Sequence, residues 1–475
     1  MAQKYVPGQM IIGFKDSVLG TAPPAQPRPL SRDALLLLAN VRTRFGAEYM
    51  ATLLHVGVPL VPELAAIPGP LTPALTDFVN AALLMPVQTI PDFAGSKTLL
   101  PDARKLVRVN LPAGNVRAAL DYVRQFPSLV AYAERMPLRF FHPQVGQFEE
   151  MPWGNEAIGF NDDVRREWYQ KELHNIAVLD SGVDAEHPAM NGQVIPVNQD
   201  AAVDRWGHGT AVSSVITAKG AQTIGSASVR EGLLPASKVL MFNVGLYNQP
   251  VSGVTFPVDF PLYMTVIAEL TAQRLGNESI KREGMQFKIR VVNMSFGGLA
   301  CSITESDVLR QAFDAGLHLV ACAGNRDGAL DDSTDVWFPA ALASVTSVSA
   351  LGKDAKLWSH AKYTNPYKGS KVAVDLAAPG QHILTAWPAN GASLQTNAVA
   401  QNYRFSLFVS GSSFAAPYVT AASSVLFDKE EKSQSTGGTG VTGKAIQQKL
   451  CGSYSKDLSV TGLGNGVLDV STLKP

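Results

Sequence analysis

The sequence predicts an α/β protein with a mostly parallel sheet, preceded by a smaller α+β module. From residue 175 onward, short apolar runs alternate with helical stretches, the pattern of crossover connections on a parallel sheet. Between residues 105 and 134, a strand, a helix and a second strand follow one another. The chain has 475 residues, 46% of them hydrophobic, which is enough for one large core and a smaller domain.

The N-terminal module begins with a β-branched and aromatic run at 9–15, which favours an edge or half-buried strand. Ser31 is suited to cap a helix over 31–42. Prolines cluster at 23–29 and again at 59–91, so a long insertion at about 16–104 is expected to hold short helices and loops. The module should then continue with a strand at 105–111, a helix at 115–126 and a strand at 129–134.

Five apolar runs in the larger part of the chain are predicted to be strands. Each ends near a polar or glycine-rich turn, the place where open α/β sheets carry their chemistry. The runs are 175–179, 238–244, 289–294, 317–321 and 343–349.

Composition excludes several classes of protein. The 40 Lys+Arg balance the 40 Asp+Glu, so no sequence-wide charge attracts nucleic acid or an anionic membrane. The apolar run 78–91 is too short to span a bilayer and contains Pro86. Three cysteines, Cys301, Cys322 and Cys451, make no disulfide framework. No signal peptide is visible, which leaves the compartment undecided between an intracellular protein and a chain that has lost its signal.

Four polar residues stand where strands end or helices begin. Asp180 ends a strand, His208 lies between two glycines at the start of a helix, Asn325 follows a small-residue run, and Ser413 opens a helix. Each has a structural alternative: a solvated or capping acid, an incidental histidine, a turn asparagine and a serine N-cap. A serine at a helix N-terminus lies near N–H groups that suit a nucleophile, and an amide can donate to an oxyanion.

Taken together in the order Asp180, His208, Asn325, Ser413, these motifs resemble those of the subtilisin-like serine proteases. The resemblance runs from about 153 to 466 and includes the segments 291–298, 375–380 and 462–466. It implies a three-layer α/β/α catalytic domain around a mostly parallel sheet. The order of the acid, the histidine and the serine along the chain differs from the order in α/β-hydrolases and in chymotrypsin-like enzymes.

The resemblance implies a role for each residue. Ser413 aligns with the family nucleophile, whereas Ser412 occupies the position of a threonine. His208 would act as the base, Asp180 would orient it, and Asn325 with the N–H of Ser413 would form the oxyanion hole.

The resemblance also implies a substrate cleft that takes extended peptide as an added strand. Trp337 stands near the expected base of the P1 pocket, so we expect a shallow pocket that disfavours large aromatic residues. The two expected pocket walls are Ser295, Phe296, Gly297 and Gly298 on one side and Ala321, Cys322, Ala323 and Gly324 on the other.

The sequence departs from the family pattern at three places. Residues 211–214 read Ala-Val-Ser-Ser where the family usually has His-Val-Ala-Gly, so the packing of that helix must differ. No calcium-loop spacing is evident; the cluster Asp331, Asp332 and Asp335 could bind calcium, but a solvated loop is the preferred interpretation, and no cofactor is required for the chemistry. Cys322 is expected to be a small buried residue, although bulky thiol reagents could still inhibit.

The domain organisation follows from the same resemblance. Residues 1–140 resemble the family's propeptide with an insertion at about 16–104; 141–152 form a linker and processing region; 153–475 form the peptidase domain. The propeptide would template folding and occupy the cleft as an intramolecular inhibitor until it is cut between about residues 135 and 150.

The sequence therefore predicts the zymogen of a subtilisin-like serine endopeptidase. Its partners would be protein or peptide substrates and its own propeptide, with no nucleic acid and no membrane, and the chain is expected to be a monomer. Two alternatives remain open: a catalytically idle peptide-binding scaffold, and an esterase or peptide ligase that uses the same site.

Overall fold

The computed structural model describes residues 4–15, 17, 30–47, 49–52, 106–141, 144–145, 153–198, 200–220, 231–246, 256–326, 331–368, 374–388, 406–433 and 440–474. Most of the insertion predicted at about 16–104, the apolar run 78–91 and much of the segment 141–152 lie outside these residues. No helix within the described ranges combines the length and hydrophobicity that a membrane span requires.

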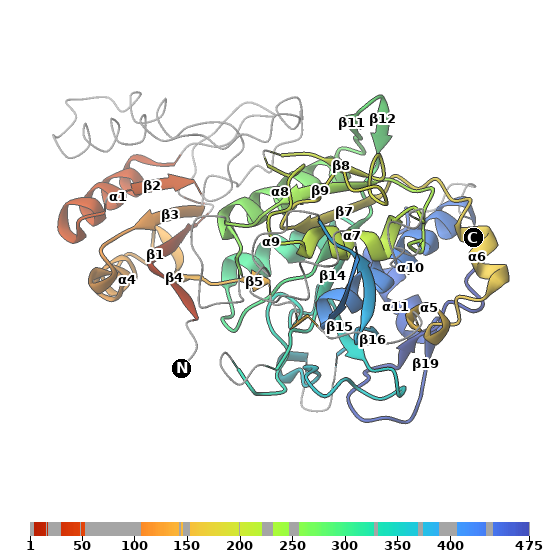
Figure 1. Ribbon diagram of the computed structural model, residues 1–475. Coiled ribbons are helices and arrows are strands. Elements are labelled where there is room, and N and C mark those ends of the chain that lie inside the picture. Colours follow the sequence, from red (N-terminus) through yellow and green to blue (C-terminus); the bar gives the residue numbers. More distant parts are fainter. Residues whose placement is uncertain are drawn as a thin grey trace.

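The N-terminal module is a four-stranded antiparallel sheet with two helices packed on it (Figure 1). The strand order is β2-β3-β1-β4, so the strand predicted near residue 11 lies between the two predicted at 105–111 and 129–134. Ser31 caps the first helix by accepting a hydrogen bond from the N–H of Ala34, as predicted. The elements are β1 (Tyr5–Phe14), α1 (Arg32–Phe45), β2 (Tyr49–Thr52), β3 (Leu106–Asn110), α4 (Val116–Val123) and β4 (Val130–Pro137).

The larger part is built on a nine-stranded sheet, which is parallel except where β19 meets β20. All five strands predicted from the sequence are present, each within three residues of its predicted start, and they lie side by side in the order β15-β14-β13-β7-β9. Their bounds are β7 (Ile176–Asp180), β9 (Val239–Asn243), β13 (Val291–Met294), β14 (His318–Cys322) and β15 (Thr346–Leu351); the others are β8 (Val194–Pro196), β16 (Leu376–Pro379), β19 (Ser455–Lys456) and β20 (Val467–Leu468).

Helices cover both faces of this sheet, which confirms the predicted three layers (Figure 1). Side chains of β7 alternate between two apolar cores: Ile176 and Val178 belong to the core under α7 and α10, and Ala177 and Leu179 to the core under α8 and α9. The helices are α5 (Gly154–Ala157), α6 (Asp162–Trp168), α7 (His208–Thr217), α8 (Phe260–Leu275), α9 (Ile303–Asp314), α10 (Ser412–Ser433) and α11 (Gly443–Ser453).

Helix α7 forms despite its unusual sequence. Every residue of it is buried. Ser214 Oγ donates to the carbonyl of Ala211 and accepts from the N–H of Ala386 in β17 (Ile383–Ala386), so the hydroxyl at 214 has partners inside the protein. The buried hydroxyl of Ser213 has no hydrogen-bond partner among the described residues.

The segment predicted as a linker contains two short strands, and the predicted boundary at 140/141 falls inside the first. Strand β5 (Phe140–Phe141) pairs with β10 (Phe256–Pro257), and β6 (Gln144–Val145) pairs with β18 (Ser406–Ser410), which also pairs with β17 (Ile383–Ala386). Two-residue strands have no periodicity of their own, and their partners are over 100 residues away. A local pattern therefore could not predict them. A separate hairpin is formed by β11 (Ile280–Arg282) and β12 (Met285–Phe287).

Candidate active site

Asp180 and His208 meet at the carboxyl edge of the sheet, where β7 ends and α7 begins. His208 Nδ1 lies 2.7 Å from Asp180 Oδ1, and both side chains are fully buried. This contact orients the imidazole through one nitrogen. The other nitrogen, Nε2, has no hydrogen-bond partner among the described residues. The ring is therefore arranged to exchange a proton at Nε2.

A glycine after His208 permits the close approach of these two loops. A Cβ on Gly209 would lie 2.1 Å from the carbonyl oxygen of Gly182 and 3.2 Å from the side chain of Asp180. The N–H of Gly209 donates to Ser181 Oγ over 2.9 Å. Glycine is therefore required here for space.

Ser413 lies in the first turn of α10, with its side chain buried. Its hydroxyl is 3.2 Å from the carbonyl oxygen of Ser295, and Ser295 Oγ in turn donates to the carbonyl of Ser413 over 2.7 Å. The hydroxyl must rotate before it can donate to His208 Nε2. Such catalytic hydrogen bonds often tighten only when substrate is bound.

Asn325 is held beside this turn with its amide in a defined orientation. Asn325 Oδ1 accepts from the N–H and from the Oγ of Ser412, over 2.9 and 3.0 Å. Because an N–H is a donor, the oxygen must face Ser412, so Nδ2 is the end of the amide that can donate to an acceptor. Nδ2 lies 3.0 Å from the position that a Cβ on Gly411 would take.

Asp204, which sequence reasoning missed, connects the loops that carry the acid and the histidine. Oδ1 accepts from Ser181 Oγ and from the N–H groups of Trp206 and Gly207, and Oδ2 accepts from the N–H and Oγ1 of Thr210. Burial raises the pKa of Asp204 to about 6, although the hydrogen bonds from Thr210 and Gly207 oppose this. Its position four residues before His208 was the only signal available in the sequence.

The two expected pocket walls face each other across Trp337. A Cβ on Gly324 would lie 2.6 Å from the indole ring, and one on Gly297 would lie 3.1 Å from Trp337 Cβ. The N–H of Trp337 donates to the carbonyl of Ala323 over 3.0 Å, and Phe338 and Gly298 exchange two backbone hydrogen bonds of 2.8 Å. Trp337 is only 2% exposed, so the indole occupies the space between the walls.

A buried cation and a carboxylate hold the indole from behind. Lys362 Nζ lies 2.7 Å from Asp331 Oδ2 and 5.4 Å from the centre of the Trp337 ring, and Trp337 Nε1 donates to Asp331 Oδ2 over 3.2 Å. Burial alone would raise the pKa of Asp331. The hydrogen bonds that Asp331 accepts from Lys362, Ser333 and Trp337 outweigh burial and hold this pKa below its ordinary value.

Two carboxylates of the acidic cluster that could have bound calcium are paired with cations of the chain. Asp331 pairs with Lys362, and Asp332 Oδ1 lies 3.1 Å from Arg326 Nη2. Among the described residues no group of three or more His, Cys, Asp or Glu side chains is arranged to hold a metal ion.

Cys322 lies directly beside the serine, with its sulfur 3.9 Å from Ser413 Oγ. The side chain is 3% exposed, and burial raises the pKa of its thiol to about 11. A neutral, buried thiol is a poor nucleophile, so Cys322 is a packing residue rather than a reactive one.

The N-terminal module sends a strand into the cleft between the pocket wall and β10. Phe140 and Gly297 exchange two backbone hydrogen bonds of 2.9 and 3.1 Å, and the N–H of Val258 donates to the carbonyl of Arg139 over 2.9 Å. The ring of Phe141 packs 5.2 Å from that of His208. Beyond it, Gln144 pairs with Ser410, three residues before Ser413. The chain therefore occupies the cleft on both sides of the triad.

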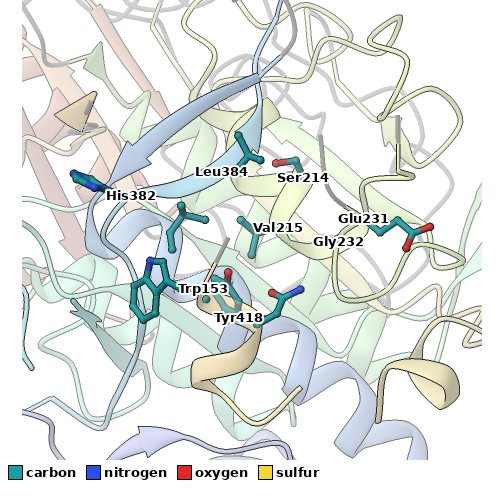
Figure 2. Close-up of a pocket in the computed structure, with 11 residues that line it drawn as sticks. Trp153, Ser214, Val215, Glu231, Gly232, His382, Leu384 and Tyr418 are labelled. Atoms are coloured by element: carbon teal, nitrogen blue, oxygen red, sulfur yellow. The ribbon is translucent and has the colours of Figure 1, made fainter. Parts of the chain in front are cut away.

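A separate hollow lies away from these residues (Figure 2). Trp153, His382 and Tyr418 surround it together with Ser214 and Val215 of α7. It contains none of the triad residues, and its volume of about 30 Å³ suits about one water molecule.

Comparison with known families agrees with this geometry. The model of the subtilase family (Peptidase_S8) matches residues 174–462, which include Asp180, His208, Asn325 and Ser413. The subtilisin-like proteinase Spm1 of Pyricularia oryzae is 30% identical over 284 residues, covering 56% of this chain and 45% of that protein. The major intracellular serine protease of Bacillus subtilis is 24% identical over 343 residues, covering 68% of this chain and 89% of that protein.

A solved structure supports the fold. The crystal structure of fervidolysin from Fervidobacterium pennivorans, a keratinolytic enzyme related to subtilisin, superposes with a TM-score of 0.61 at 19% identity. The match covers 99% of this chain and 61% of the fervidolysin chain. This chain therefore spans well under the full length of fervidolysin, and the same holds for the Pyricularia proteinase.

Proposed function

Because the chain belongs to the subtilase family, whose model matches more than half of it, we propose that it is a serine endopeptidase made as a zymogen. The observation that carries the proposal is the buried contact of 2.7 Å between His208 Nδ1 and Asp180 Oδ1, with Ser413 at the start of a neighbouring helix. These are the three groups that acyl transfer through a serine requires.

The proposed reaction proceeds through an acyl-enzyme on Ser413. Ser413 Oγ attacks the carbonyl carbon of a peptide bond while its proton passes to His208 Nε2. The C–N bond then breaks as His208 returns that proton to the leaving amine. A water molecule, deprotonated by His208, attacks the acyl carbon and releases the acid together with the free serine. Asp180 fixes the tautomer of His208 and stabilises the imidazolium.

The negative oxygen that forms in both steps needs fixed donors. Asn325 Nδ2 is one, because its Oδ1 is already bound by Ser412. The N–H of Ser413 is the other, since the first N–H groups of α10 have no partner within the helix. Both donors are positioned before substrate arrives, so no reorganisation is needed during the reaction.

The N-terminal module acts in this proposal as an intramolecular inhibitor. Support comes from the strand pairing of Phe140 with Gly297, which occupies the edge where an extended substrate would pair. A second contact holds the module in place. The carboxylate of Glu134 accepts from Ser302 Oγ and from the N–H groups of Ile303 and Thr304, and so caps α9. Activation would require cleavage between about residues 135 and 150.

The substrates would be extended polypeptides with a small residue on the acyl side of the cleaved bond. Trp337 supports this, because its indole lies against both Gly297 and Gly324 and leaves a shallow P1 pocket. We expect the chemistry to need no cofactor, the protein to act as a monomer, and the site to be usable by ester substrates as well.

Labelling with a fluorophosphonate tests the proposal. The wild-type chain and Ser413→Ala are incubated with the probe, followed by intact mass measurement and N-terminal sequencing. Labelling and shortening of the wild type alone would support both the nucleophile and the zymogen. Ser412→Ala should still label, because that hydroxyl bonds Asn325 and Gly324 rather than substrate. A wild type that neither labels nor shortens would favour the idle scaffold.

A further inference from the structure

Arg139 directly precedes β5 in the segment 138–141 that occupies the cleft, called the cleft strand below, and it makes an unusually complete set of contacts for a cation. Its side chain is fully buried. Nε and Nη2 donate to the two carboxylate oxygens of Glu305 over 2.9 and 2.5 Å, which is a bidentate ion pair. Nη2 also donates to the carbonyl of Ala300 over 2.8 Å, and Nη1 to that of Leu138 over 3.0 Å. Four hydrogen bonds therefore satisfy most of the guanidinium.

The pocket around Arg139 belongs to the catalytic domain, apart from Leu138. Glu305 lies in the first turn of α9, and its N–H donates to the capping hydroxyl of Ser302. The ring of Phe260 lies 5.9 Å from Arg139 Cζ. Tyr263 is buried beside the pair, and burial and then the charge of Glu305 raise its pKa well above its ordinary value. A carboxylate, an aromatic face and a carbonyl oxygen together suit a planar cation.

Removal of the cleft strand would leave Glu305 without its partner. The residue is fully buried, and in the described part of the chain Arg139 is its only ion-pair partner. Release of the strand would open the pocket to solvent, but a peptide that covered Glu305 again without supplying a cation would bury an unpaired carboxylate, which is strongly unfavourable. An active form that has released the strand therefore keeps a pocket with a preference for a replacement cation.

The strand register tells which substrate residue would enter this pocket. Phe140 pairs with Gly297, so in the same antiparallel register a substrate residue two positions later lies opposite Ser295. The carbonyl oxygen of Ser295 is 3.2 Å from Ser413 Oγ, so that substrate residue carries the carbonyl under attack. That residue is P1, so Phe140 occupies the place of P3. Arg139 therefore occupies the place of P4, the fourth residue before the cleaved bond.

On this basis, and resting on the proposed endopeptidase function, we propose that Glu305 forms an arginine-binding subsite that selects peptides with arginine at P4. Lysine would bind less well, because an ammonium group cannot bridge both carboxylate oxygens and the carbonyl of Ala300 in one plane. The same contacts explain why an arginine, rather than an apolar residue, stands at this place in the inhibitory strand.

Cleavage of a matched set of internally quenched peptides tests the subsite. The peptides differ only at P4, which is arginine, lysine, citrulline or norleucine, and carry mixed residues on both sides of the cleaved bond. The activated wild type should cleave the arginine peptide about 100-fold faster, by kcat/KM, than the citrulline peptide, which has the same shape without charge. In Glu305→Gln this ratio should fall to near 1. Equal cleavage of all four peptides by the wild type would overturn the inference, and so would a ratio that Glu305→Gln leaves unchanged.

A second measurement needs no catalysis and separates this inference from the proposed function. In the full chain carrying Ser413→Ala, thermal unfolding is compared for Arg139→Lys, Glu305→Gln and the double variant. Each single change should lower Tm by about 5 °C or more. The double variant should lose much less Tm than the sum of the two single losses, because both changes disrupt the same ion pair. Additive losses would overturn the arginine site. Strong coupling in this background, together with a wild type that cleaves none of the peptides, would support the site and count against the endopeptidase function alone.

Discussion

Ser181 Oγ donates a hydrogen bond to Asp204 Oδ1 over 2.9 Å and accepts one from the N–H of Gly209 over the same distance. Ser181 follows Asp180 directly, and Gly209 follows His208 directly. This relay therefore fixes the distance between the two residues of the buried pair through their neighbours. It explains how a contact of 2.7 Å can be held between an acid at the end of β7 and a histidine at the start of α7.

Asp204→Asn should lower kcat by about 10- to 100-fold and change KM less, because the amide presents a donor to groups that themselves donate. Kinetics on a fluorogenic peptide, together with the rate of fluorophosphonate labelling, would measure this. Asp200→Asn is the matched control, since Asp200 is an exposed aspartate outside the Ser181–Asp204–Gly209 relay. An unchanged kcat in Asp204→Asn would show that the relay does not position the triad.

Gly209→Ala should reduce activity by at least about 100-fold and destabilise the protein. The added methyl group would meet the carbonyl oxygen of Gly182 at 2.1 Å, and that oxygen belongs to the backbone and cannot move aside cheaply. Labelling rate and Tm are the measurements. Gly452→Ala serves as the control, because nothing lies within 4 Å of its added Cβ in helix α11, and it should keep wild-type labelling. A fully active Gly209→Ala would refute the steric argument.

Glu269 in α8 gives the protein a pH-dependent stability. Burial raises its pKa to about 7 from an ordinary value of 4.5, so the folded chain binds this proton more tightly than the unfolded chain. The resulting stabilisation is fully present below pH 4.5 and is lost as pH rises through 7. By pH 8.5 the loss should be on the order of 2–3 kcal/mol.

Glu269→Gln should therefore gain Tm relative to its parent as pH rises from 5 to 8.5, because the amide has no charge to bury. The Ser413→Ala background prevents self-digestion during the measurement. Exposed Glu186 offers the matched control, and Glu186→Gln should follow the parent at every pH. Parallel Tm curves for Glu269→Gln and its parent would disprove this assignment.

The sequence predicted those parts of the molecule that repeat a local pattern. The apolar strand at 175–179 and its final Asp180 could be found because burial on both faces requires a continuous apolar run and because parallel strands end at one edge. His208, between two glycines, and Ser413, two residues after Gly411, were recognisable because each lies at a helix start where small residues are needed for close approach.

Contacts between distant loops could not be predicted in this way. Arg139 and Glu305 are 166 residues apart, and neither lies in a pattern that indicates an ion pair. Lys362 is one lysine among many in the sequence, and only the folded chain brings it behind Trp337. Such pairs depend on tertiary geometry, in which a side chain's partner is set by the packing of whole elements rather than by spacing along the chain.

Trp337 should restrict the residue on the acyl side of the cleaved bond to glycine, alanine or serine. Its indole touches both pocket walls, and the ion pair of Lys362 with Asp331 keeps the ring from swinging away. Trp337→Ala should raise the cleavage of peptides with phenylalanine at P1 by about 10- to 100-fold relative to alanine, because burial of a large apolar side chain then becomes available. A P1 library cleaved by both proteins would measure the ratio, and the alanine peptide corrects for any loss of folded enzyme. A wild type that already prefers phenylalanine at P1 would contradict the prediction, since the pocket would then have to open without any change at Trp337.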